Sequence, residues 1–312
     1  MMKTIAIGVD IGGSHVSCAA CHMEEKTFLP GTMSENELDN QGPVEEIIGI
    51  WSRTIQETIA KVGLEQVMGI GFAMPGPFDY TNGIALFKGN NKKYESIYGL
   101  HVPDALREKL NLPAGFPIRF INDATAFAIG EEWIGKARGT GNSLSITLGT
   151  GFGSAFLSNR LPVTSGENVP ATGAVWHLPF EDGNADDYFS TRGLLNRYQT
   201  LTGQQLSGVK ELAQLAANEK IAKELFVDFG YKMGIFLKPW LERSKSEVLV
   251  IGGNISNAYH LFGKHLQDYL SENGVDIRIE ISELKETAAM IGCSILADDA
   301  YYEQLKPLLA TM

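Results

Sequence analysis

Two short glycine-rich segments, each at the end of an apolar run, constrain the fold of this chain more than any other feature. The first is residues 8–14 (GVDIGGS) and the second is residues 147–153 (TLGTGFG). In each, the apolar run resumes after the glycines, which is typical of two strands joined by a tight turn. Glycine leaves backbone N–H groups open to an anion, and the hydroxyls of Ser14, Thr147 and Thr150 add donors. Each turn could therefore bind the oxygens of a phosphate group.

A single turn of this kind would be weak evidence, because a strand followed by two glycines is usually an ordinary tight turn. The repetition favours a phosphate-binding role. Neither segment has the glycine spacing of a dinucleotide-binding motif or of a P-loop. The pair instead resembles the superfamily of actin, Hsp70 and sugar kinases. We therefore predict an α/β fold with two actin-like ATPase (ribonuclease H-like) domains around a central cleft, each presenting one hairpin to ATP.

The composition agrees with this fold and narrows the partners. The chain has 312 residues, 44% of them hydrophobic and 20% charged, which is enough for two α/β domains with their own cores. Its net charge of −11 argues against a nucleic-acid surface, and an anionic nucleotide would need a cation, so we expect Mg²⁺. We see neither a signal peptide nor an apolar run of membrane-spanning length, so we expect a cytoplasmic protein without a membrane partner.

The three cysteines do not suggest a disulfide framework or a zinc site. Cys18 and Cys21 form a C-x-x-C pattern, and Cys293 is far from it in the sequence. Residues 18–21 continue the strand that leaves the first glycine segment, and residues three apart on a strand point to opposite faces. A zinc site would also need a second pair of ligands, which we do not find. We therefore expect no structural zinc.

The periodicity of apolar residues predicts alternating strands and helices. We expect strands at residues 3–10, 14–22, 26–30, 67–74, 117–121, 161–165 and 248–251, and a hairpin over 142–158. We expect helices at 43–62, 102–110, 220–243 and 286–301, and two more starting near 124 and 256. The first domain should span residues 1–121, completed by the C-terminal helix at 297–312, and the second domain residues 122–296.

Asp123 is the candidate catalytic residue. It lies after a predicted buried strand and before a predicted helix, where open α/β sheets present catalytic groups. Helix capping is an equally good explanation for an aspartate at this place. Phosphoryl transfer to an alcohol needs a carboxylate that orients the hydroxyl and accepts its proton. We assign that role to Asp123, and we assign Mg²⁺, directly or through water, to Asp10.

The order and spacing of several motifs resemble the ROK family of sugar kinases over nearly the whole chain. The motifs are residues 10–14 (DIGGS), 69–79 (GIGFAMPGPFD), 122–124 (NDA), 130–131 (GE), 147–153 (TLGTGFG) and 252–253 (GG). The resemblance implies ATP-dependent phosphorylation of a hexose such as glucose, with Asp123 as general base and with Asn91 and Asn122 bound to sugar hydroxyls. An N-acetylhexosamine or fructose is the alternative substrate. We assign nucleotide binding to the glycine segments and their neighbours: Asp10, Gly12, Gly13, Ser14, Thr147, Gly149, Thr150, Gly151, Gly252 and Gly253. Gly252 and Gly253 either leave room for a base or ribose or form a plain turn between a strand and a helix.

The chain departs from the family where the sugar should bind. Family members usually carry Gly-Glu-x-Gly-His followed by a cysteine-rich zinc loop, and the Glu and the His both bind the sugar. Here the segment keeps His177 but has Ala174 in place of the Glu and Trp176 in place of a Gly. The zinc cysteines are absent, as in the branch that includes polyphosphate glucokinases. In that register Asp186 takes the place of the family's second sugar-binding Glu.

These departures leave the identity of the hexose open. A charged hydrogen bond contributes about 1.5–3 kcal/mol, so the loss of the Glu would weaken sugar binding roughly tenfold to a hundredfold. Trp176 could stack on an apolar sugar face or could simply fill space. A non-catalytic sugar sensor remains the alternative of another class. We do not expect a DNA-binding repressor, because we see no winged helix before the strand of Asp10. We also expect a homodimer.

Overall fold

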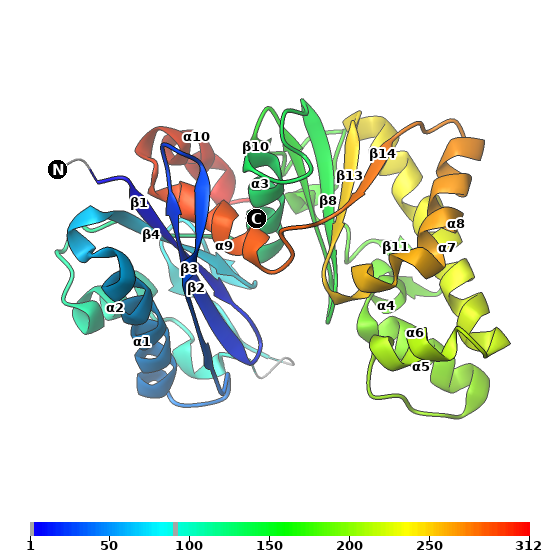
Figure 1. Ribbon diagram of the computed structural model, residues 1–312, viewed down its shortest axis with the longest axis horizontal. Helices are drawn as coiled ribbons and strands as arrows, with labels where there is room; N and C mark the ends of the chain where they lie inside the picture. Colours follow the sequence, from blue (N-terminus) through cyan, green and yellow to red (C-terminus); the bar gives the residue numbers. More distant parts are fainter. Residues whose placement is uncertain (1–2, 90–92) are drawn as a thin grey trace. The chain divides into compact units, whose positions relative to one another are not determined.

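The computed structural model describes residues 3–89 and 93–312, so Asn91 lies outside the described residues. The chain divides into two compact units, Met1–Ile134 with Glu286–Met312, and Gly135–Lys285. Each unit contains one five-stranded sheet with helices packed on it, so the predicted α/β class is confirmed (Figure 1).

The sheet of the first unit has the strand order β3-β2-β1-β4-β7. The strands β1 (Ile5–Ile11), β2 (His15–His22) and β3 (Thr27–Glu37) are antiparallel, whereas β4 (Val67–Met74) and β7 (Ile118–Asn122) run parallel to β1. Helix α1 (Val44–Val62) covers one face, where the ring of Trp51 contacts Phe72 of β4. Helix α2 (Val102–Leu110) packs on α1. The predicted strands and helices of this region are confirmed, although β3 is longer than predicted.

Helix α9 (Thr287–Ser294) lies on the opposite face, close to the backbone of the sheet. Gly71 precedes Phe72 and therefore faces away from α1. A Cβ atom on Gly71, or on its neighbour Gly8 in β1, would lie 1.8 Å from a carbonyl oxygen of α9, so neither position has room for a side chain. Helix α3 (Asp123–Trp133) approaches α9 as closely, at Gly130. This packing places α3 and α9 in the first compact unit, whereas the sequence assigned them to the second.

The end of the chain differs from the prediction of one helix at residues 286–301. Helix α9 ends at Ser294, a 3₁₀ turn covers Ile295–Ala297, and a new helix, α10 (Asp299–Leu309), follows. The side chain of Asp298 accepts a hydrogen bond from the Tyr301 N–H at 2.9 Å and so caps α10. Because this cap starts a new helix, the prediction of a single helix was wrong.

The second unit repeats the strand arrangement of the first, with the order β10-β9-β8-β13-β14. The strands β8 (Asn142–Leu148), β9 (Phe152–Ser158) and β10 (Leu161–Pro162) are antiparallel. The strands β13 (Val248–Gly252) and β14 (Arg278–Ile281) run parallel to β8. The repeated arrangement is that of two related domains, as predicted. The strand at 161–165 shrinks to two residues, and β14 was not predicted because its charged residues interrupt the apolar pattern.

The helices of the second unit enclose an aromatic core. Helix α7 (Lys220–Ser244) continues past Pro239 and packs on α8 (Tyr259–Glu272), which begins three residues later than predicted, after a 3₁₀ turn at Asn254–Ala258. Three helices that were not predicted, α4 (Ala185–Phe189), α5 (Thr191–Thr202) and α6 (Val209–Leu215), complete the unit. The rings of Phe189, Phe229 and Phe236 are buried among them.

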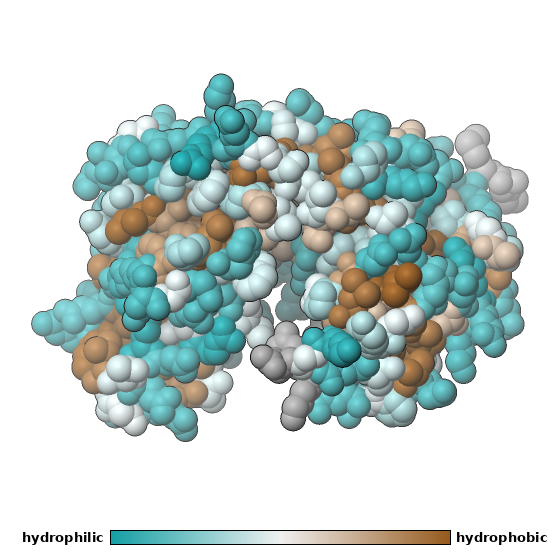
Figure 2. All heavy atoms as spheres, turned by 180° about the vertical axis from the view of Figure 1, so that it is seen from behind, coloured by the Kyte–Doolittle hydropathy of each residue, from teal (hydrophilic) through white to brown (hydrophobic). Residues whose placement is uncertain are grey.

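One face of the molecule is polar over most of its area (Figure 2). Figure 2 shows hydrophilic residues across most of the face drawn, with apolar residues gathered in smaller areas. Within residues 3–89 and 93–312, no helix has both the length and the apolar character required to cross a membrane.

Candidate active site

The parallel strands of the first unit bring two aspartates to the same edge of the sheet. Asp10 pairs with Ala73 of β4, and Ala73 pairs with Ile121 of β7. Asp123 comes directly after β7 as the first residue of α3. Because the carboxyl ends of parallel strands meet at one edge, Asp10 and Asp123 lie where open α/β sheets bind their ligands.

The geometry of Asp123 separates its two suggested roles. The helix cap of α3 is made by Asn122, whose Oδ1 accepts the Thr125 N–H at 3.1 Å. Asp123 is therefore not the capping residue. Its Oδ1 accepts the Ala124 N–H at 2.8 Å and the Nδ2 of Asn122 at 3.0 Å. Burial raises the pKa of the Asp123 carboxyl above its usual value, and these hydrogen bonds offset only part of the rise.

Asp10 carries the second unusual carboxyl group. Burial raises its pKa to about 7, and the negative charges of Asp123 and Glu286 add to the rise. A cation near Asp10 would relieve this repulsion. Among the described residues, no group of three or more His, Cys, Asp or Glu side chains is placed to hold a metal ion. A single carboxylate such as Asp10 could hold Mg²⁺ in its common mode, in which the ion keeps several waters and also binds substrate phosphates.

Tyr80 contacts Asn122, the neighbour of Asp123, and was not predicted from the sequence. Its buried hydroxyl donates to the Met74 carbonyl at 3.1 Å and accepts from Asn122 Nδ2 at 3.4 Å. Burial, followed by the charge of Asp123, raises the pKa of Tyr80, so the hydroxyl stays protonated. The Asn122 amide is thus held by Tyr80 as well as by Asp123 and Thr125. Tyr80 is 42 residues from Asn122 in the chain, and no local motif marks it.

At the tip of the first hairpin, the N–H groups of Gly13 and Ser14 point away from the side chains and backbone that bind the tip. Each of its three carbonyl oxygens accepts a hydrogen bond: Gly12 from the Tyr94 hydroxyl (2.5 Å), Gly13 from the Asn40 amide, and Ser14 from the Leu38 N–H (2.8 Å). In a trans peptide, a carbonyl and the next N–H point to opposite sides. The N–H groups of Gly13 and Ser14 therefore point away from these partners, as binding to an external anion requires.

A cation lies beside this tip. A Cβ atom on Gly13 would be 3.4 Å from Nζ of Lys93, so the ammonium group is next to the glycine backbone. Its positive charge would favour a phosphate in a chain whose net charge is −11. Lys93 was not predicted from the sequence, because it follows the hairpin by about eighty positions and no local motif links the two.

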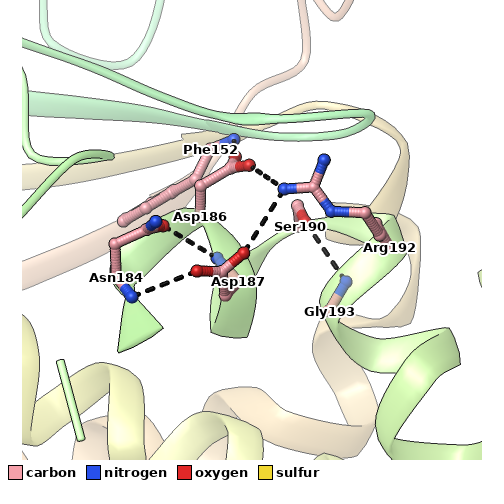
Figure 3. Close-up of polar contacts among 7 residues, drawn as sticks. All are labelled: Phe152, Asn184, Asp186, Asp187, Ser190, Arg192 and Gly193. Carbon is pink, nitrogen blue, oxygen red and sulfur yellow. Dashed lines mark hydrogen bonds and ion pairs between the residues drawn. The ribbon is translucent and has the colours of Figure 1, made fainter. Parts of the chain in front are cut away.

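The second hairpin is fixed by residues that follow it in the chain. Gly149 accepts the Thr191 N–H at 2.8 Å and donates its own N–H to the Gly151 carbonyl at 3.0 Å. The Phe152 N–H donates to Oδ1 of Asp186 at 2.7 Å (Figure 3). The predicted sugar ligand Asp186 thus also binds the hairpin. Thr150 is exposed at the tip.

His177 and Trp176 lie close to Asp186 within the second unit. The Asp186 N–H donates to the Trp176 carbonyl at 2.9 Å. The ring of Trp176 meets the ring of His177 edge to face, with centroids 5.3 Å apart, and both residues are exposed. The structure thus brings together three of the residues discussed for the sugar site. Trp176 does not fill a gap, because 51% of it is exposed.

A pocket of about 750 Å³ opens beside the second hairpin, within the second unit. It is lined by Thr191, Gly208, Val209, Lys210, Ala213, Gln214, Asn254, Ile255, Asn257, Ala258 and His260. Gly253, at the end of β13, has a φ of +80°, and a Cβ atom there would lie 2.4 Å from the Leu148 carbonyl oxygen. Strand packing alone therefore requires Gly253, and the open space begins just after it.

The segment that replaces the family's zinc loop is held by its own contacts. The short strands β11 (Pro179–Phe180) and β12 (Gly183–Asn184) pair, and Asn184 and Asp187 form a reciprocal capping box at the start of α4. The Phe180 ring packs on Phe189 and Phe236.

We therefore expect purified protein to contain no stoichiometric zinc and to unfold at the same temperature with and without a chelator. Elemental analysis and thermal unfolding would check this. One zinc ion per chain, together with unfolding by the chelator, would contradict it.

Comparisons with known proteins find similar proteins over most of the chain. A model of the ROK family matches residues 6–300. A glucokinase from Thermotoga maritima is 26% identical, over 94% of this chain and 97% of its own length. A xylose repressor from Caldicellulosiruptor bescii is 22% identical, over 92% of this chain and 76% of its own. The crystal structure of a ROK glucokinase from Streptomyces griseus in complex with glucose and AMPPNP is similar, with a TM-score of 0.72 and 20% identity over 94% of this chain and 98% of that one. Both have the actin-like ATPase fold.

Proposed function

The chain belongs to the ROK family, and on this basis we propose that it is a sugar kinase that transfers the γ-phosphoryl group of ATP to a hydroxyl group of a hexose. Glucose or a related hexose is the proposed substrate, with an N-acetylhexosamine or fructose as the alternative. The observation that carries the proposal is the position of Asp123. Asp123 is the first residue of α3 and lies at the same sheet edge as Asp10. Asn122, and not Asp123, caps the helix.

We assign the role of general base to Asp123. Its Oδ1 is held by the Ala124 N–H and by Asn122, so the carboxylate is oriented before the substrate binds. Its raised pKa gives the carboxylate a higher affinity for the hydroxyl proton than an exposed aspartate has. Asp10 would hold Mg²⁺ through its water shell, and the ion, when bound, would neutralise charge on the phosphates.

We assign the phosphates to the two hairpins and the nucleoside to the pocket of the second unit. Gly13 and Ser14 of the first hairpin, and Thr147, Thr150 and Gly151 of the second, offer backbone or hydroxyl donors. Gly12 and Gly149, whose N–H groups bond within their own hairpins, leave the backbone open to the phosphates. The pocket at Asn254–His260, just beyond Gly252 and Gly253, has a volume typical of small-ligand sites. A base and ribose would fit there, with the phosphates leading toward Thr191.

We assign the sugar to Asn91, Asn122, His177 and Asp186. A sugar sensor without catalysis is the second candidate, because Ala174 stands where the family has a sugar-binding Glu and because the relatives include a repressor. Hexose-stimulated release of ADP from ATP and Mg²⁺ distinguishes the two. A kinase releases ADP only when its hexose is present, whereas a sensor binds the hexose and releases none.

Trp176 provides a direct test of where the sugar binds. Trp51 and Trp133 are buried and Trp240 is partly buried, so Trp176 should dominate the quenching of tryptophan fluorescence by acrylamide. We expect the bound hexose to stack on Trp176 and shield it. An aromatic contact contributes about 0.5–1.5 kcal/mol, so Trp176→Ala should weaken hexose binding roughly twofold to tenfold.

Tyr231→Ala is a matched control, because Tyr231 is 50% exposed on α7 and is not assigned to the site. It should leave hexose affinity unchanged. If calorimetry shows hexose binding while the quenching of Trp176 stays the same, the stacking role is wrong.

A further inference from the structure

We infer that Arg192 binds the phosphate chain of the nucleotide at the second hairpin and that Asp186 positions Arg192 for this contact. The inference rests on the proposed function, because it requires that a nucleotide binds this unit. It gives Asp186 a role that the sequence did not suggest, and it adds a residue that no motif marked.

One carboxylate joins the hairpin to the guanidinium group. Oδ1 of Asp186 accepts the Phe152 N–H at 2.7 Å, and Oδ2 binds Nη2 of Arg192 at 2.8 Å (Figure 3). The same Nη2 lies 3.5 Å from Oδ1 of Asp187. The side chain of Asp186 is only 17% exposed, and it is held by the hairpin through Oδ1 and by Arg192 through Oδ2. Movement of the hairpin tip and movement of Arg192 are thereby linked.

Arg192 follows a residue that contacts both the pocket and the hairpin tip. The residue before it, Thr191, lines the 750 Å³ pocket and donates its N–H to the Gly149 carbonyl at 2.8 Å. A nucleoside in the pocket that directs its phosphates to the tip would therefore pass Thr191 and Arg192. This position makes Arg192 the nearest arginine along α5 to the path of the phosphates.

The charges around the tip require a cation there. The carboxylates of Asp186 and Asp187 lie beside the hairpin and would repel a phosphate. Arg192 offsets this repulsion. Both of its ion pairs use Nη2, and its side chain is 59% exposed, so other N–H donors of the guanidinium remain available to a ligand. The planar guanidinium can bind phosphate oxygens through two parallel hydrogen bonds.

Calorimetry with three ligands tests the inference: ADP with Mg²⁺, adenosine, and the hexose that gives the highest turnover. We expect Arg192→Gln to weaken ADP binding roughly tenfold to a hundredfold, the usual loss for a charged hydrogen bond. Adenosine affinity should not change, because adenosine has no phosphate. Arg192→Lys should recover part of the ADP affinity.

Arg197→Gln is the matched control. It removes the same charge from the same helix, but Arg197 pairs with Asp228 of α7 and not with the hairpin. Its ADP affinity should equal that of the wild type.

Asp186→Asn separates positioning from sugar binding. The amide oxygen can still accept the Phe152 N–H, but the charge that holds Arg192 is lost. We expect weaker ADP binding, because Arg192 loses the charge that positions it, in addition to the loss of hexose affinity expected from the sugar contact assigned to Asp186. Weaker hexose binding with unchanged ADP binding would leave Asp186 as a sugar ligand alone and would overturn its positioning role.

Two other results would overturn the role of Arg192. One is an ADP affinity for Arg192→Gln equal to that of Arg197→Gln. The other is an equal loss of ADP and adenosine affinity, which would indicate damage to the pocket. If the wild type binds neither ADP nor ATP, the proposed function itself fails, and this inference fails with it.

Discussion

Asp123→Asn should leave a folded protein that binds nucleotide and hexose but has lost about 10²–10⁴ in turnover, the usual contribution of a positioned general base. The asparagine oxygen can still accept the hydrogen bond from the Ala124 N–H, so α3 should begin as it does now. Only the capacity to accept the proton of the hydroxyl is removed. Steady-state kinetics, with thermal unfolding as the check on folding, measure the effect.

Asp104→Asn is the control for this variant. Asp104 also lies in the first turn of a helix, α2, but its side chain is 71% exposed and pairs only with His101 and Arg107 in the described part of the chain. Its turnover should stay close to that of the wild type. A folded Asp123→Asn protein with near-normal kcat would mean that another group is the base.

Asp10→Asn should stabilise the protein without ligand while it abolishes or severely reduces activity. Burial and the nearby charges of Asp123 and Glu286 raise the pKa of Asp10 from 3.8 to about 7. Keeping Asp10 ionised in the folded state at pH 8 therefore lowers the free energy of unfolding by roughly 2–4 kcal/mol. The neutral amide of asparagine does not have this cost. Activity falls because the amide is a much weaker partner for Mg²⁺ and its waters.

The pH dependence of this effect has a defined sign. The folded-state pKa of Asp10 lies above the unfolded value, so between about pH 4 and pH 7 the folded state binds more protons than the unfolded state. The contribution of Asp10 to stability is thus greatest below pH 4 and is lost as the pH rises to 7. The advantage of Asp10→Asn over the wild type should be smallest below about pH 4, should grow between about pH 4 and pH 7, and should stay constant at higher pH.

Denaturant unfolding in the presence of a chelator, for both proteins across this pH range, measures the difference. A stability difference that does not depend on pH would show that Asp10 keeps an ordinary pKa. It would remove the reason for placing a cation beside it.

Much of the fold could be predicted because the signals were local. The hairpins at residues 8–14 and 147–153 combine apolar runs with glycines, and α1 follows a clear helical period. Asp10 and Asp123 could be found for the same reason, since each lies in a short motif at the end of a strand. The resemblance to the ROK family then indicated a role for each of these two residues.

The features that were missed depend on contacts between distant segments. The close approach of α9 to Gly8 and Gly71 assigns α9 to the first unit, and no local pattern reveals which strand a helix will cover. The helices α4 to α6 have 5, 12 and 7 residues, so each offers few turns over which an apolar period can repeat. The start of α10 did have a local signal, the capping aspartate Asp298, but the apolar run on either side concealed it.

The same limit applies to the site. Asp186 was assigned a sugar-binding role by its place in a family motif, and that role stays a prediction. Its bond to the Phe152 N–H joins residues 34 positions apart, and the contact of Tyr80 with Asn122 joins residues 42 positions apart. Pairings of this kind are set by the packing of elements, so they could be read only from the structure.

Mass spectrometry of the sugar products tests the central claim most directly. Wild-type protein and Asp123→Asn would each be incubated with ATP, Mg²⁺ and one hexose at a time, including glucose, fructose, mannose and N-acetylglucosamine. We predict that the wild type forms a hexose monophosphate from at least one of them, in equal amount to the ADP released, and that Asp123→Asn forms almost none. Binding of a hexose by the wild type without any phosphorylated sugar above the Asp123→Asn level would contradict the assignment of this chain as a sugar kinase.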